Sequence, residues 1–200
     1  MGLSFKEAVE KRRTYYGISN ASPVSDAEIQ EIIEEAVKNV PSAFNSQSTR
    51  IVLLLGENHK KFWNITKEIL RKILPTDAFG ATENKIDGAF GAGYGTVLFY
   101  EDQEVVEGLQ KTFALYSENF PVWSQHTSAM HQYVIWTALE EVGFGASLQH
   151  YNPLVDTEVA KAWDINPRWK LIAQLPFGTP TVQPGEKEIA PIEKRVLVYR

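Results

Sequence analysis

A cluster of basic residues and a hydroxyl group near the amino terminus has the chemistry needed to bind a phosphate. Lys11, Arg12, Arg13 and Thr14 follow one another directly. Guanidinium groups form charge-assisted hydrogen bonds with phosphate oxygens, and a threonine hydroxyl can add another. Basic residues are also common at the end of a helix, where they balance the helix dipole. Taken alone, the cluster leaves both interpretations open.

Two further segments carry polar groups suited to a ligand. Pro41–Gln47 contains small and amide side chains, and Asn45 and Gln47 could match the donor and acceptor pattern of a flavin ring or its ribityl chain. A plain connection between a helix and a strand would have a similar composition. Near the other end of the chain, Lys194 and Arg195 form a basic pair, which in most proteins is simply part of the surface.

The segment from Gly143 to Pro153 could also face a ligand. Its two glycines, at positions 143 and 145, end a predicted apolar helix, and Asn152-Pro153 is a typical start for the next helix. The chain between them crosses a region that we expect to be buried. Its backbone N–H groups and the side chains of Gln149 and His150 are therefore candidate ligand contacts, although a lone histidine is more often structural.

Several kinds of chemistry are disfavoured by what the sequence contains. Gly91, Gly93 and Gly95 precede an apolar run, whereas the glycines of a dinucleotide-binding loop follow a strand and open a helix. His126 and His131 are five residues apart, which turns them to different faces of a helix and argues against a metal site. No hydrolase G-x-S-x-G and no P-loop motif occurs. His59 precedes two lysines, and we expect it to be solvated.

Composition narrows the class of protein further. A chain of 200 residues with 44% hydrophobic content is typical of one domain, here 1–200. The formal net charge of −5, with dispersed basic residues, disfavours nucleic-acid binding. The chain has no cysteine, so redox chemistry would require a bound cofactor. Nothing approaches a membrane span or a signal peptide, so we expect a cytoplasmic protein with no membrane partner.

The elements that must position these residues can be predicted from local patterns. Ser4 and Ser25 are each followed three residues later by glutamate, a capping box that opens a helix. The second helix has an apolar stripe from Ile29 to Val40. Short apolar runs predict buried strands. These runs are Ile51–Leu55, Thr96–Tyr100 and Leu171–Leu175, with a possible short strand at Val196–Tyr199.

One predicted helix has almost no polar face. Between Thr127 and Val142, apolar residues occur on all sides. A small domain rarely encloses such a helix with its own elements, so we expect it to be buried against a second copy of the chain in a symmetric homodimer.

Together, these segments resemble the nitroreductase superfamily in order, residue type and spacing over nearly the whole chain. Lys11-Arg12-Arg13-Thr14 is similar to the family's phosphate motif, and Pro41–Gln47 to its P-S-x-x-N-x-Q flavin loop. Ala173–Pro180 resembles the segment before the closing basic motif. Leu148–Pro153, which reads L-Q-H-Y-N-P, is similar to a compact branch that includes the fatty-acid-repression-mutant proteins and the copper-induced nitroreductases. The resemblance implies an α+β fold with three α/β/α layers, a mostly antiparallel central sheet and a homodimeric assembly.

The resemblance also assigns residues to FMN. It implies that Arg12, Thr14 and Arg195 contact the phosphate, with Arg13 nearby in a different role, and that the Ser42–Asn45 loop comes from the other subunit. Gln149 and His150 are implied to lie near the flavin N5. Tyr16 and Lys85 match the family pattern only loosely, and Phe44 suggests an aromatic wall beside the flavin ring. The complete implied FMN set is Arg12, Arg13, Thr14, Tyr16, Ser42, Ala43, Phe44, Asn45, Gln47, Lys85, Leu148, Gln149, His150, Lys194 and Arg195.

The activity implied is hydride transfer from NADH or NADPH through FMN to a nitroaromatic or quinone acceptor by a ping-pong mechanism. The cofactor carries this chemistry, so no catalytic side-chain dyad is needed. The alternative is a flavin-binding regulatory or sensor protein that responds to lipid, metal or redox stress and turns over only incidentally. A flavin face left open to solvent favours the enzyme, whereas one plugged by Phe44, Trp123 or Tyr151 favours the sensor.

Overall fold

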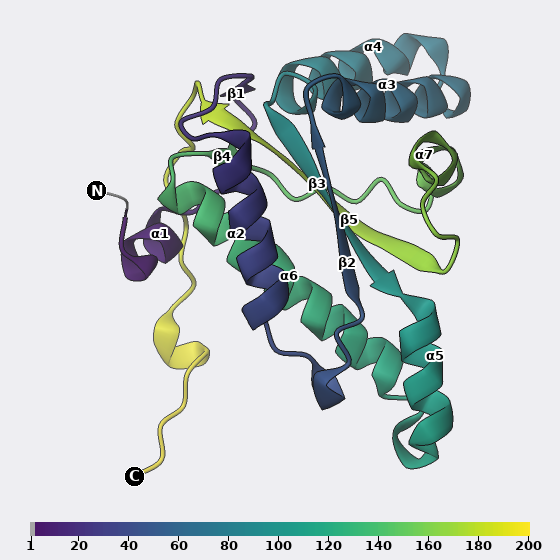
Figure 1. Ribbon diagram of the computed structural model, residues 1–200. Coiled ribbons are helices and arrows are strands. Elements are labelled where there is room, and N and C mark those ends of the chain that lie inside the picture. Colours follow the sequence, from purple (N-terminus) through teal and green to yellow (C-terminus); the bar gives the residue numbers. More distant parts are fainter. Residues whose placement is uncertain (1–2) are drawn as a thin grey trace.

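The computed structural model describes residues 3–200 and is built around a five-stranded sheet (Figure 1). The strand order is β1-β5-β3-β2, with β4 also paired to β5, and every pair of strands is antiparallel. The strands are β1 (Ile18–Ser19), β2 (Thr49–Leu55), β3 (Gly95–Asp102), β4 (Gly145–Ala146) and β5 (Trp169–Pro180). The three main predicted strands are confirmed, and each is longer than its apolar run.

Helices cover both faces of this sheet, which confirms the predicted three-layer α+β fold (Figure 1). One face packs on α2 and α6, and the other packs on α3, α7 and a single π-helical turn at Ile86–Phe90. The α-helices are α1 (Phe5–Lys11), α2 (Asp26–Asn39), α3 (Gly56–Ile73), α4 (Thr76–Lys85), α5 (Gln103–Thr112), α6 (Phe120–Glu141) and α7 (Asp156–Trp163). Short 3₁₀ turns occur at Ala43–Asn45, Ala114–Tyr116 and Ile192–Lys194.

The first two helices begin where the capping boxes predicted. At α2, the Glu28 N–H donates to Ser25 Oγ at 3.3 Å, and the Ser25 N–H donates to Glu28 Oε2 at 2.9 Å. Ser4 and Glu7 make the equivalent pair of bonds at α1. These bonds satisfy backbone N–H groups that the first helical turn leaves without intrahelical partners.

Strand β3 lies at the centre of the sheet and is buried along its whole length. Its side chains alternate between the two layers, as the period of two in a strand requires. Val97 and Phe99 pack with α2 and α6, whereas Leu98 and Tyr100 pack with α3 and α7. This continuous burial on both faces explains why β3 reads as an unbroken apolar run.

The helix after Asn152-Pro153 begins later than predicted. Residues 152–155 form turns, and α7 starts at Asp156. The buried side chain of Gln174 on β5 accepts from the Tyr151 N–H at 2.7 Å and donates to Asn152 Oδ1 at 3.1 Å. Because these bonds tie the chain to the sheet edge, helical geometry is delayed until the chain has left β5.

The carboxyl-terminal segment forms no strand, so the short strand predicted at Val196–Tyr199 is wrong for this chain by itself. Residues 185–200 are exposed throughout, and the hydrogen bonds found beyond Pro191 stay within one local turn. A strand requires a partner edge to satisfy its backbone groups. Within residues 3–200, this tail pairs with no such edge.

Helix α6 is longer than predicted and is only partly covered. It begins at Phe120, with Pro121 in its first turn, a position that proline favours. Ile135 and Leu139 are fully buried against the sheet. Met130 and Tyr133, in contrast, remain 39% and 41% exposed. The prediction that this helix is buried on every side is therefore not met within one protomer, where an apolar strip stays open.

Candidate functional site

Arg12 ends helix α1 and packs against α6. Its guanidinium carbon lies 4.4 Å from the centre of the Trp136 ring and 5.8 Å from that of Tyr133. This is cation–π geometry. The Arg12 Nε atom is buried and has no hydrogen-bond partner among the described residues. Arg12 is therefore fixed in place by aromatic rings and keeps an unused N–H donor.

Arg13 has a different environment, as its adjacent position on the chain predicted. It lines a hollow of about 740 Å³ beside the end of α6. Charged residues of both signs share this hollow with it, namely Glu10, Lys11, Glu140 and Glu141. Because three carboxylates oppose two cations there, the hollow is a poor site for a dianion.

The chain after Arg13 runs beside strand β4. The Tyr15 N–H donates to the Ala146 carbonyl at 3.0 Å, and Thr14 forms a parallel bridge with Ala146. The Tyr15 side chain turns inward, where its hydroxyl donates to Glu140 Oε1 at 3.2 Å. Burial, followed by the charge of Glu140, raises the pKa of Tyr15. The Thr14 side chain is exposed and free to meet a ligand.

The segment Leu148–His150 crosses the sheet edge as one isolated step of β-pairing. The Gln149 N–H donates to the Gln174 carbonyl at 2.7 Å, and the Gln174 N–H donates back at 2.9 Å. In an antiparallel pair, backbone groups of successive residues point in opposite directions. The N–H groups of Leu148 and His150 therefore point away from β5, and they have no partner within residues 3–200. The Gln149 N–H, in contrast, already donates to β5 and is not free to bind a ligand.

Tyr16 and Lys85, the two loosely matching positions, come together in the structure. Lys85 Nζ lies 5.7 Å from the centre of the Tyr16 ring and 5.7 Å from that of Phe90. The Phe90 ring is in turn 6.2 Å from that of Tyr151, directly after His150. Segments from three parts of the sequence, around Tyr16, Lys85–Phe90 and Tyr151, thus converge at this end of the sheet.

The loop Ser42–Gln47 lies elsewhere, against the amino-terminal half of α6 (Figure 1). Phe44 is stacked on Trp123, with ring centres 5.9 Å apart and planes at 19°, and it also contacts Phe113 and Phe120. Arg12 contacts α6 at Trp136. With a rise of about 1.5 Å per residue, Trp123 and Trp136 are roughly 20 Å apart along the helix. One protomer therefore keeps the loop and Arg12 at different ends of α6.

The basic pair near the carboxyl terminus makes no contact of these kinds with the other predicted FMN residues in the described part of the chain. Lys194 and Arg195 are exposed, and within residues 3–200 neither forms an ion pair or side-chain hydrogen bond. Their part in a phosphate site stays a prediction.

His59 is buried, so the prediction that it is solvated is wrong. Its exposed fraction is 1%, with Nδ1 2.8 Å from Thr96 Oγ1 and Nε2 3.2 Å from the Gly91 carbonyl oxygen. Burial lowers its pKa to about 4. The neighbouring lysines misled the prediction, because adjacent helical residues point in directions about 100° apart.

A buried polar cluster behind the Ser42–Gln47 loop was also missed. Glu101 has no exposed surface and accepts hydrogen bonds from the hydroxyls of Ser48 and Thr49, both at 2.6 Å. Thr49 Oγ1 is 3.3 Å from Nδ1 of the buried His131 on α6. No motif marks this cluster, because its members come from three elements. The local signal for it is a charged residue, Glu101, near the end of the mostly apolar strand β3.

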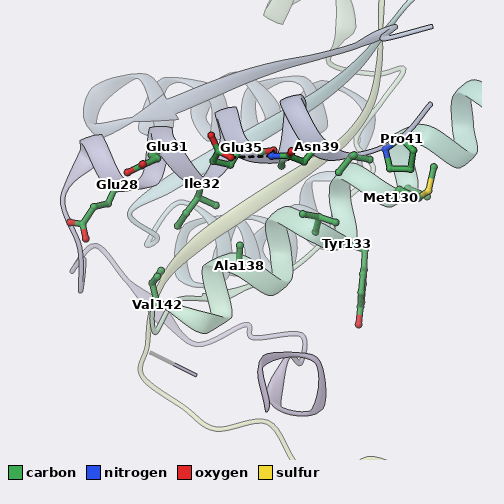
Figure 2. A pocket seen from close by; sticks show the side chains of 14 residues that line it. Glu28, Glu31, Ile32, Glu35, Asn39, Pro41, Met130, Tyr133, Ala138 and Val142 are labelled. Atoms are coloured by element: carbon green, nitrogen blue, oxygen red, sulfur yellow. Dashed lines mark hydrogen bonds between the residues drawn. The ribbon is translucent and has the colours of Figure 1, made fainter. Parts of the chain in front are cut away.

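An apolar groove of about 940 Å³ runs between α2 and α6 (Figure 2). Ile32 projects into it from α2, and Tyr133 and Ala138 line it from α6. Glu28, Glu31 and Glu35 follow one edge. The groove includes none of the predicted FMN residues, and it coincides with the open strip of α6.

Comparison with known proteins places these features in a family. The model of the nitroreductase family matches residues 9–179. Nitroreductase FRM2 of Saccharomyces cerevisiae is 33% identical over 186 residues, which cover 92% of this chain and 92% of that protein. No helix within residues 3–200 has the length and apolar character to cross a membrane.

Solved structures agree with this match. Nitroreductase CinD from Lactococcus lactis, in complex with 4-nitrophenol, has 43% identity and a TM-score of 0.89, covering 98% of this chain and all of that one (100%). The same enzyme has been solved with chloramphenicol. An FMN complex from Desulfovibrio desulfuricans, at 18% identity and a TM-score of 0.70, covers 100% of this chain and 99% of its own, and it shares the fold. The chain belongs to the nitroreductase family and is an oxidoreductase.

Proposed function

We propose that this protein is an FMN-dependent oxidoreductase that transfers hydride from NADH or NADPH to nitroaromatic or quinone acceptors. The observation that carries the proposal is the convergence of Arg12–Tyr16, Lys85 and Leu148–Tyr151 at one end of the sheet. Similarity to an enzyme solved with 4-nitrophenol supports the class of acceptor. FMN, when bound, would supply the hydride chemistry.

The residues present fit this cofactor. Arg12 has an unpartnered buried N–H, and Thr14 presents an exposed hydroxyl on the next segment. Together with Arg195 and the neighbouring Lys194, they would bind the phosphate, with Arg13 packed nearby. Tyr16 and Lys85, which contact each other, would face the ribityl chain. The outward-pointing N–H groups of Leu148 and His150, with the Gln149 side chain, would hydrogen-bond the ring and hold it in one orientation.

We propose a homodimer as the form that completes this site. The open apolar strip of α6 and the groove beside it require a cover. In a two-fold dimer whose symmetry axis is perpendicular to α6, the two copies of the helix pack side by side and run in opposite directions. The Ser42–Gln47 loop of one protomer would then lie near Arg12 of its partner. Ser42, Ala43, Phe44, Asn45 and Gln47 would thus reach the flavin from the other subunit.

The surroundings of Phe44 favour an enzyme over a sensor. Phe44 is 50% exposed, and together with Trp123 and His126 it lines a hollow of about 350 Å³. The aromatic rings therefore form the wall of an opening instead of filling it. An aromatic acceptor can stack on such a wall in an offset or edge-to-face arrangement.

The proposal is tested first by a spectrum and then by kinetics. The purified protein should be yellow and should oxidise NADH or NADPH in the presence of a nitroaromatic. Because Gly91–Gly95 leads into a strand and forms no nucleotide loop, donor and acceptor should share one pocket and bind in turn. Double-reciprocal plots should be parallel. A colourless protein would exclude the proposed function, and intersecting lines would reveal a separate nicotinamide site.

A further inference from the structure

The loop Ser42–Gln47 has an unfavourable backbone shape. Phe44, Asn45 and Gln47 have φ angles of 56°, 50° and 49°, which lie in the left-handed region that residues other than glycine avoid. Inside the loop, the Asn45 N–H donates to the Ser42 carbonyl at 3.0 Å and the Gln47 N–H donates to Ser42 Oγ at 3.0 Å. Such a shape persists only where surrounding structure holds it.

The holding structure is the end of strand β3. Both carboxylate oxygens of Glu101 accept hydrogen bonds, one from Ser48 and one from Thr49, the two residues directly after the loop. The Asp102 N–H donates to the Ser48 carbonyl at 2.9 Å. Ser48 and Thr49 are thus fixed to β3 by side-chain hydrogen bonds as well as by backbone pairing.

A second link reaches the loop itself. Arg50 Nη1 donates to the Gln47 carbonyl at 2.8 Å, and Arg50 Nη2 donates to Asp102 Oδ2 at 3.0 Å. The guanidinium group therefore bridges the last strained residue of the loop and the carboxylate beside Glu101. Its planar fork suits this double contact, which a lysine could not reproduce.

Glu101 contributes hydrogen bonds that packing alone does not require. A carboxylate without exposed surface is costly to bury, and an apolar residue would maintain the pairing of β2 with β3 equally well. The groups that face it are the hydroxyls of Ser48 and Thr49, the charges of Arg50 and Asp102 and, through Thr49, His131. Burial raises the pKa of Glu101, and the two hydroxyl bonds oppose that shift. The bonds to the loop exit are the feature that an apolar residue would lose.

We infer that Glu101, supported by the Arg50–Asp102 ion pair, is a positioning residue that holds the Ser42–Gln47 loop in the shape that receives the partner subunit's cofactor. This inference rests on the proposed function. Glu101 has no exposed surface and acts through Ser48 and Thr49.

The test compares Glu101→Gln with a matched variant of the same strand. An amide has one acceptor oxygen, so Glu101→Gln cannot accept from both hydroxyls through its two terminal atoms. Thr96→Val is the control. Thr96 is equally buried and hydrogen-bonded to Trp63 and His59, but it lies at the far end of β3 from the loop. Ser48→Ala is a milder variant that removes one hydroxyl bond.

The first readout is hydrogen exchange of the loop amides in the dimer without added flavin. Glu101→Gln should speed exchange of the Asn45 and Gln47 amides at least tenfold and Ser48→Ala at least threefold. Thr96→Val should leave both amides unchanged even where it lowers the melting temperature. Unchanged loop exchange in Glu101→Gln, or in Ser48→Ala should Glu101→Gln not fold, would overturn the inference.

The second readout is the FMN dissociation constant. Glu101→Gln should raise it at least tenfold, Glu101→Asp should restore part of the affinity, and Thr96→Val should have no effect. If loop exchange responds while the wild-type protein binds no flavin, the proposed function fails and the anchoring role stands. If affinity in Glu101→Gln stays within twofold of wild type although the wild type binds FMN, positioning toward the cofactor is refuted.

Discussion

At the scale of single residues, the two arginines proposed to bind the phosphate differ in their surroundings. Arg12 is fixed by Trp136, whereas Arg195 is exposed. We predict that Arg195→Ala and Arg12→Ala each weaken FMN binding by about 1.5–3 kcal/mol, because each removes a charge-assisted bond to the phosphate. Only Arg12→Ala should also lower the stability of the flavin-free protein. Fluorescence titration and thermal unfolding measure the two effects.

The control for this pair is Lys187→Ala, which removes an exposed cation from the same tail. It should change neither the affinity nor the melting temperature. The double variant of Arg12 and Arg195 should release most of its flavin on dialysis. Full retention of flavin would contradict the phosphate assignment.

His59 gives the protein a specific sensitivity to acid. Burial lowers its pKa from 6.5 to about 4, so between these values the unfolded chain takes up a proton that the folded chain does not. The free energy of unfolding therefore falls as pH falls through this window, by about 3 kcal/mol in total. His59→Gln removes this titration while keeping a neutral hydrogen-bonding side chain. Urea unfolding from pH 7 to pH 4 should show a shallower decline in this variant, and equal slopes would rule out His59 as the cause.

At the scale of elements, helix α2 depends on its first turn. Ser25 accepts from the Glu28 N–H, and Glu28 accepts from the Ser25 N–H. Ser25→Ala should lower the free energy of unfolding by about 1 kcal/mol, because the first turn loses a hydrogen bond to its side chain. Ser25→Asp keeps an acceptor at the same place and should stay close to wild type. Equal losses in both variants would show that the cap bond is not responsible.

At the scale of the whole molecule, the site should require two chains. Val134 is 37% exposed on the open strip of α6 and lines the groove beside α2. Val134→Glu should place a charge in the dimer interface, produce monomers and release FMN together with the partner's loop. Ile73→Glu, at the end of α3 on the other side of the sheet, is the control and should stay dimeric. Sedimentation at low concentration measures both, and a monomer that keeps FMN would contradict the composite site.

The sequence by itself determined the starts of two helices, the three main strands and the family. The starts of α1 and α2 were predictable because each capping box is a bond between residues three apart, here Ser25 and Glu28. The central strand was predictable because burial on both faces leaves an unbroken apolar run. The family followed from motifs such as Leu148–Pro153, whose order and spacing are properties of the chain alone.

Only the tertiary structure decided which residues meet. His59 is buried because of the sheet face on which α3 lies, a fact that its lysine neighbours do not encode. The tail remained without a strand because a strand needs an edge from elsewhere. Glu101 binds Ser48, which is 53 residues away in the sequence. Lys85 likewise packs on Tyr16, which belongs to a distant part of the chain. Such contacts depend on how whole elements pack, and packing satisfies burial and hydrogen bonding over the entire molecule instead of residue by residue.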